Sequence, residues 1–154
     1  MSSTPQPASR IEALRAALGA SRAALLDAIG TLAERDFASS LPSGKTVVAT
    51  LATLAPQERA AIHVARAAIG APERHRLGGG EAAHARALPP QVVHDLAGAR
   101  YETLLFLDSL LTDQLDIAAG ESTVEAVLAA VTAREQAIAD QVAERPRPGN
   151  ATSP

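Results

Sequence analysis

The side chains with the clearest chemical potential in this chain are its four histidines, His63, His75, His84 and His94. Imidazole binds divalent metals and transfers protons near neutral pH, so each histidine is a candidate for a metal site or for acid–base catalysis. Glu81-x-x-His84 matches one half of a di-iron carboxylate motif, but that site needs a second such pair and two further glutamates on inner helices. We therefore interpret the four histidines as surface or loop residues.

The chain lacks the residues or motifs that several other kinds of catalytic and binding site require. The chain has no Cys, which excludes disulfides, thiolate nucleophiles and cysteine-bound metals. The glycines at 78–80 lack the Lys and the preceding strand of a phosphate loop. Ser109, His94 and Asp108 occur without the elbow or oxyanion loop of a hydrolase triad. We expect no catalytic residue, no bound metal and no cofactor.

Composition indicates one helical domain. The 154 residues are 47% hydrophobic but only 2% aromatic, so Ala and Leu must build a core that favours helices over a sheet. A net charge of −3 without a basic cluster argues against nucleic-acid binding. No apolar run approaches the roughly 20 residues that span a membrane, and the first residues do not resemble a secretory signal. We expect a cytoplasmic protein.

Helical spacing of apolar residues predicts four helices, over 9–35, 46–69, 90–115 and 123–144. The second helix is the centre of the predicted fold, and its inward positions are expected to be Val47, Leu51, Leu54, Ala55, Ile62 and Ala65. Pro56 should kink this helix near residues 52–55 because proline removes one backbone hydrogen bond.

In the third helix, the inward positions are expected to be Val93, Leu96, Ala97, Tyr101, Leu104, Leu105, Leu107 and Leu111. The run 104–107 is apolar on several sides, which indicates deep burial or an oligomer contact, and we expect a homodimer. In the fourth helix, a capping box from Ser122 to Glu125 should begin the helix, and Val124, Val127, Leu128, Val131, Ile138 and Val142 should face inward.

The expected fold is all-α, an up-down-down-up type four-helix bundle over residues 9–144. A long crossover joins its second and third helices and holds a short helix at 81–87. Residues 1–8 and 145–154 are expected to be disordered tails.

Two segments of this pattern resemble the DinB-like family of four-helix bundles, which includes mycothiol-dependent isomerases and thiol transferases. The first segment, 46–59, reads Thr-Val…Leu-Ala-Thr-Leu-Ala-x-x-Glu-Arg, and the second, 134–142, lies in the fourth helix. The resemblance implies a divalent metal held by three histidines, one from the second helix and two from the fourth. The matching positions here are Thr53, Arg134 and Ile138, none of which is a suitable ligand.

The resemblance therefore implies a metal-free bundle, with Thr53, Arg134, Ile138 and Glu58 lining the former metal pocket. An inward Arg134 must be paired, by Glu58, Glu102, Asp108 or a bound anion, unless it extends to solvent instead. The first expectation is a non-catalytic bundle that binds a small molecule or a protein partner there, with a stress or resistance role. The alternative is a metal-dependent hydrolase or a mycothiol- or bacillithiol-type thiol transferase that uses His63, His94 or neighbouring carboxylates.

Overall fold

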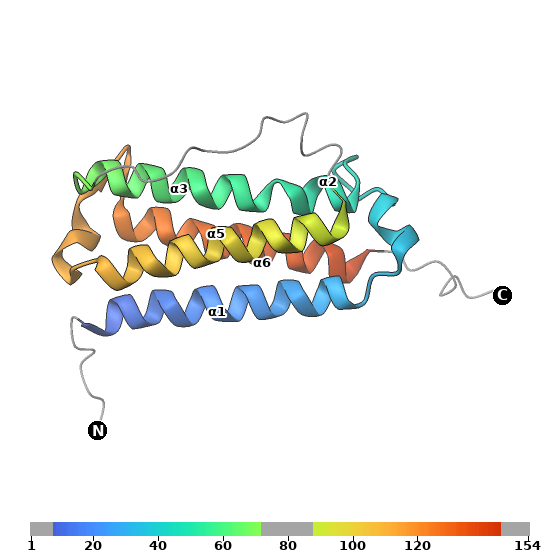
Figure 1. Cartoon of the computed structure of the whole chain (residues 1–154), viewed down its shortest axis with the longest axis horizontal. Helices are drawn as coiled ribbons and strands as arrows, with labels where there is room; N and C mark the ends of the chain where they lie inside the picture. The colour runs from blue at the N-terminus through green and yellow to red at the C-terminus, as the bar shows by residue number, and fades with distance from the viewer. Residues whose placement is uncertain (1–7, 72–87, 146–154) are drawn as a thin grey trace, which may run out of the picture.

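The computed structural model describes residues 8–71 and 88–145, which are mainly α-helical (Figure 1). The helices are α1 (Ala8–Gly30), α2 (Val47–Ala52), α3 (Leu54–Ala68), α5 (Pro89–Ser109) and α6 (Val124–Glu144). Single 3₁₀ turns, η1 (Glu34–Ala38) and η2 (Thr112–Asp116), follow α1 and α5. A minimal antiparallel hairpin of β1 (Ala118–Ala119) and β2 (Ser122–Thr123) precedes α6. The prediction of an all-α fold is confirmed apart from this hairpin.

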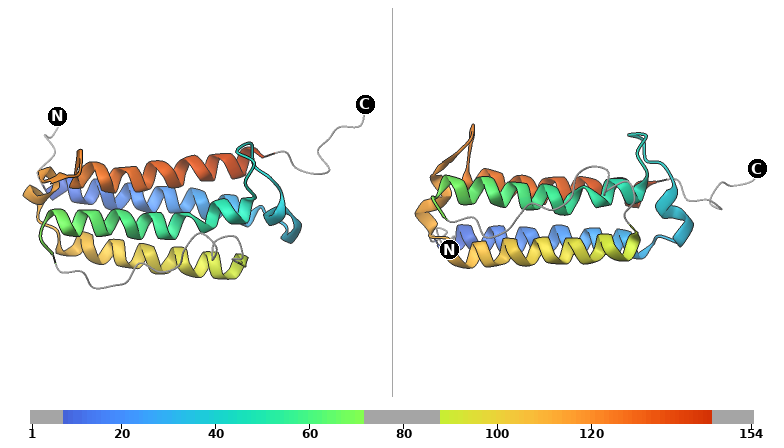
Figure 2. Two further views of the ribbon diagram at one scale, coloured as in Figure 1. Left: turned by 90° about the horizontal axis from the view of Figure 1, so that it is seen from above. Right: turned by 45° about the horizontal axis from the view of Figure 1, so that its top comes forward.

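The four long helices α1, α3, α5 and α6 lie side by side (Figure 2). Helix α6 packs against both α1 and α3, and α3 also packs against α5. Within the two described ranges, no helix combines the length and hydropathy that crossing a membrane requires.

The core consists of two apolar clusters. One is built from residues such as Leu25, Leu51, Leu96 and Val142, and the other from residues such as Leu18, Ile62, Phe106 and Leu128. On each long helix, the residues of the two clusters are separated by a buried or half-buried charged or hydroxyl residue. A polar layer therefore crosses the middle of the helical bundle.

The predicted second helix is interrupted where the sequence indicated. Helix α2 ends at Ala52 and α3 begins at Leu54, with Thr53 between them. Pro56 has no N–H, so the carbonyl of Ala52 loses its donor four residues on and the helix bends there. All six residues that were predicted to face inward in this segment are buried, which confirms the predicted face.

The predicted inner face of the third helix is partly wrong. Val93, Ala97, Tyr101, Leu105 and Leu111 are exposed. Leu96 and Leu107 are buried as predicted, and the other buried residues of this helix are Val92, Ala99, Arg100, Thr103 and Phe106. The inner face carries two polar residues, so a search for apolar periodicity selected the apolar residues of the outer face. The helix also ends at Ser109, before the predicted limit near 115.

Several predicted ends also differ. Helix α1 ends at Gly30 rather than near residue 35. Thr123, not Ser122, caps α6, because its hydroxyl accepts the N–H of Ala126. Arg145, which was assigned to the tail, is buried and pairs with Asp36 of η1. The predicted short helix at 81–87 and most of both predicted tails lie outside the described residues.

Candidate functional site

The polar layer is a cluster of charged groups to which all four long helices contribute. Its members are Ser21 and Arg22 from α1, Glu58 from α3, Arg100 and Thr103 from α5, and Glu135 from α6. We call these six residues the core ion cluster.

The spacing of each helix aims these side chains inward. On α6, Glu135 follows Val131 by four residues and precedes Ile138 by three, which is the spacing of one buried helical stripe. On α1, Ser21 holds the same kind of position between Leu18 and Leu25. The cluster therefore occupies positions that apolar side chains would otherwise fill.

Arg100 is the most extensively bonded member. Its Nε donates to Oε1 of Glu58 at 2.7 Å, and its Nη2 donates to both carboxylate oxygens of Glu135 at 3.1 Å. Its Nη1 donates to the backbone carbonyl of Leu18 at 2.7 Å. One guanidinium thus links α5 to the three other long helices.

Arg22 and the two hydroxyls complete the cluster. Arg22 Nη2 lies 3.0 Å from Oε2 of Glu135 and 3.5 Å from Oε2 of Glu58. The Ser21 hydroxyl donates to Glu135 at 2.7 Å, and the Thr103 hydroxyl donates to Glu58 at 2.8 Å. Each carboxylate therefore accepts bonds from two guanidinium groups and one hydroxyl.

The cluster is electrically balanced and closed. Two arginines neutralise two glutamates, and both glutamates are only 2% exposed. Among the described residues, every fully buried side-chain polar atom of the cluster has a hydrogen-bond partner. Buried charges are tolerated when they are paired and hydrogen-bonded in this way. Such groups hold helices together and leave no free acid, base or nucleophile directed at a substrate.

Arg134 does not lie where the family resemblance placed it. It is exposed, so the hypothesis of an inward Arg134 is wrong, and the alternative of a side chain that extends to solvent agrees with the structure. Its neighbour Glu135 takes the inward position. The three carboxylates considered as its partners bind other arginines: Glu58 binds Arg100, Glu102 binds Arg59, and Asp108 binds Arg15.

The other predicted pocket residues lie in or near the core. Ile138 is buried in the apolar cluster that includes Ala52 and Leu54, which flank Thr53. Thr53 is half-buried, and its hydroxyl donates to the carbonyl of Thr50 at 2.7 Å. Glu58 is held within the core ion cluster. Of the four predicted pocket residues, Ile138 and Glu58 are thus buried, Thr53 is half-buried and Arg134 is exposed.

The histidines are separated in the structure as far as it describes them. His63 is half-buried on α3, and His94 is exposed on α5. No group of three or more His, Asp or Glu side chains that could hold a metal ion occurs within residues 8–71 and 88–145. His75, His84 and Glu81 lie outside these ranges.

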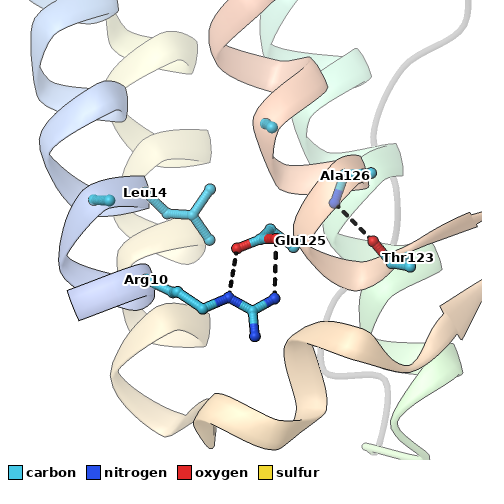
Figure 3. A pocket seen from close by; sticks show the side chains of 7 residues that line it. Arg10, Leu14, Thr123, Glu125 and Ala126 are labelled. Carbon is cyan, nitrogen blue, oxygen red and sulfur yellow. Dashed lines mark hydrogen bonds and ion pairs between the residues drawn. The ribbon is translucent and has the colours of Figure 1, made fainter. Parts of the chain in front are cut away.

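A shallow hollow of about 380 Å³ lies between the starts of α1 and α6 (Figure 3). Its walls include Ala13, Leu14, Ala126 and Ala129, with Arg10, Thr123 and Glu125 at its polar end.

Arg10 binds both Glu125 at 3.0 Å and Asp116 at 2.8 Å, so its charge is already paired. These bonds, chiefly the one to Asp116, raise the pKa of Arg10 and hold the pKa of the Asp116 carboxyl below its usual range. The hollow presents small apolar side chains beside a closed ion pair.

Sequence reasoning missed most of the core ion cluster, namely Ser21, Arg22, Arg100, Thr103 and Glu135. A signal for two of them was present, because Ser21 and Glu135 interrupt apolar stripes at regular spacing. A polar residue at such a position indicates a buried partner on a neighbouring helix.

No family model, no curated protein and no solved structure matches the chain.

Proposed function

We propose that this chain is a non-catalytic, metal-free four-helix bundle of the DinB-like type, cytoplasmic and homodimeric, that acts by binding a protein partner. The observation that carries the proposal is the closed core ion cluster. Its charged groups bind one another, so among the described residues this cluster offers no free group for chemistry or for holding a polar small molecule. Binding must then use the outer helical surface.

The arrangement of the helices supports an up-down-down-up topology. In Figure 1 the colours run in one direction along α1 and α6 and in the opposite direction along α3 and α5. Helix α3 therefore ends, and α5 begins, at opposite ends of the bundle, as the up-down-down-up topology requires.

The residue types at the former ligand positions support the proposal that the bundle binds no metal. Thr53 is engaged with backbone, Ile138 is packed in the apolar core, and Arg134 is exposed. An arginine cannot bind a cation at neutral pH, and an isoleucine has no donor atom. The DinB-like assignment itself rests on the sequence resemblance over 46–59 and 134–142.

Metal content tests this function. The untagged protein is offered zinc, nickel, manganese and iron in turn, and the purified samples are assayed by mass spectrometry. We expect well under one metal per chain in every case. One tightly bound metal per chain would overturn the proposal and support the alternative, a hydrolase or thiol transferase. His63→Ala and His94→Ala variants would then show whether those side chains are ligands.

A ligand panel separates the two classes of binding partner. Carboxylates and phosphates are added to the parent, and the melting temperature is recorded. We expect no stabilisation. A compound that raises the melting temperature of the parent, and raises that of a Thr53→Val variant less, would contradict a protein partner. It would indicate that the chain binds a small molecule in the former metal pocket.

A further inference from the structure

The outer face of α5 carries an unusual set of exposed apolar residues. Val93, Tyr101 and Leu105 are 40%, 65% and 47% exposed. Together with the exposed Ala97, they follow one another at intervals of four residues along a single side of the helix. Large exposed apolar residues gathered on one face of a helix indicate a protein contact rather than chance exposure.

The same face is complementary to itself about Tyr101. When two copies of α5 lie antiparallel with a two-fold axis at Tyr101, each residue meets one that is equally far from residue 101 on the other side. Ala97 then lies opposite Leu105 of the second copy, a small residue against a large one. His94 lies opposite Asp108 of the second copy, since these residues stand seven before and seven after Tyr101.

The charged pair suits this arrangement. A histidine N–H donates to a carboxylate whether the ring is neutral or protonated. His94 is exposed, and the Asp108 side chain is 61% exposed with its Oδ1 bound to Arg15 at 2.7 Å. The carboxylate has a second oxygen with which to accept a bond from a second copy. Two such pairs would flank the central tyrosines, one on each side of the axis.

Helix α1 widens the apolar face. Arg15 binds Asp108, and Arg22 donates to the carbonyl of Leu96, so α1 and α5 run antiparallel with fixed alignment. In this alignment Leu26, which is 46% exposed, comes level with the start of α5 near Val93. Leu26 also follows Arg22 by four residues, so it lies on the side of α1 that faces α5, and the apolar face extends beyond a single helix.

We propose that the outer face of α5 is a homodimer interface in which two copies pack antiparallel about Tyr101, with His94 of each copy bound to Asp108 of the other. This inference rests on the homodimer of the proposed function and specifies its surface and register. The occupant is a second copy, because the face matches itself in both size and charge.

Sedimentation velocity of the full chain over a range of concentrations tests the interface. Tyr101→Glu should raise the dimer dissociation constant by about 30-fold or more, since it places two charges at the centre of the contact. The matched control is Val64→Glu on α3, where another large hydrophobic residue, 43% exposed, lies outside the proposed face. The control should dimerise as the parent does, and circular dichroism verifies that both variants fold.

A charge exchange tests the register. His94→Asp should weaken the dimer by about tenfold, because it opposes two carboxylates on each side of the axis. Adding Asp108→His restores opposite partners in this register alone, so the double variant should recover most of the affinity. A double variant as weak as His94→Asp would overturn the antiparallel register.

The outcomes separate this inference from the function on which it rests. A parent that stays monomeric at about 100 µM, a concentration well above the usual dissociation constants of specific dimers, overturns the interface. A dimer insensitive to Tyr101→Glu overturns the α5 assignment and leaves the homodimer in place. A dimer that responds as expected but holds one metal per chain supports the interface and overturns the metal-free function.

Discussion

Two groups of paired charges in this molecule use the same chemistry in different surroundings. In the core ion cluster, arginine side chains that are 9% and 13% exposed bind glutamate side chains that are almost fully buried. At the hollow between α1 and α6, Arg10 binds Asp116 and Glu125 with side-chain exposures from 35% to 69%. The bond lengths are similar, so the main difference is access to water.

That difference decides what the bonds contribute. At the surface, water solvates a charge that loses its partner, and the pair is worth little. In the core, a charge that loses its partner stays buried, and the cost is several kcal/mol. The core ion cluster therefore adds little net stability as a whole, but the fold loses much stability when one of its members is removed.

The largest effect is expected when one core carboxylate is removed. Glu135→Leu leaves Arg22 and Arg100 facing a single glutamate and should lower the free energy of unfolding by about 3–5 kcal/mol. Urea unfolding measures the change. The adjacent variant Arg134→Leu is the control, and because Arg134 is exposed it should change stability by less than about 0.5 kcal/mol. Equal losses in both variants would contradict the burial of Glu135.

A smaller effect is expected when all four charges are removed together. The combined variant carries Arg22→Met, Glu58→Leu, Arg100→Met and Glu135→Leu. No buried charge is left without a partner, so stability should return to within about 2 kcal/mol of the parent, or exceed it. Ser21 and Thr103 keep acceptors in the backbone carbonyls of Leu18 and Ala99. If the combined loss equalled the sum of the single losses, the four charges would act independently.

The pair of Asp36 and Arg145 is an intermediate case, because it is buried but lies at the end of the bundle. The N–H of Ala33 and then the Arg145 guanidinium hold the pKa of the Asp36 carboxyl below its ordinary value. A lowered pKa in the folded state contributes stability that is complete above the unfolded pKa of about 3.9 and is lost as the pH falls through the folded value.

Unfolding measured from pH 6 down to about pH 2 checks this contribution. Asp36→Asn should be less stable than the parent at pH 6, and the difference should shrink as acid protonates Asp36 in the parent. A difference that stays constant with pH would show that Asp36 does not titrate as its partners imply.

The smallest effect is expected at the hollow. Asp116→Asn removes one exposed partner of Arg10 and leaves the other, Glu125. The melting temperature should change only slightly, and the change should vanish at about 1 M salt, where charges are screened within about 3 Å. A large loss of stability that salt does not reduce would show that this surface pair contributes as strongly as the buried pairs of the core ion cluster.

The sequence predicted the helices better than it predicted the site. The inward face of 47–65 and the break at Thr53 follow from apolar spacing and one proline, which are local properties. The family resemblance then assigned Arg134 to the interior, whereas the apolar spacing of α6 assigns that position to Glu135.

The core ion cluster could not be assembled from the sequence, because its members belong to helices whose relative rotation only tertiary packing fixes. Arg100 illustrates this, since its neighbours Leu96, Ala97, Tyr101 and Leu104 were all predicted to face inward from apolar spacing. The pairing of Arg100 with Glu58 and Glu135 depends on which sides of three helices meet.

The pairing of α1 with α6 sets an order of events during synthesis. Glu135 is made 114 residues after Ser21, to which it binds. At about 5–20 residues per second, a ribosome needs on the order of 6–23 s to supply it. For that time the nascent α1 lacks the carboxylate that binds both Ser21 and Arg22 in the folded protein, and the Ser21 hydroxyl has only the carbonyl of Leu18 within its own helix. Helix α1 is rich in alanine, which limits the number of large apolar side chains that it exposes to other nascent chains during this time.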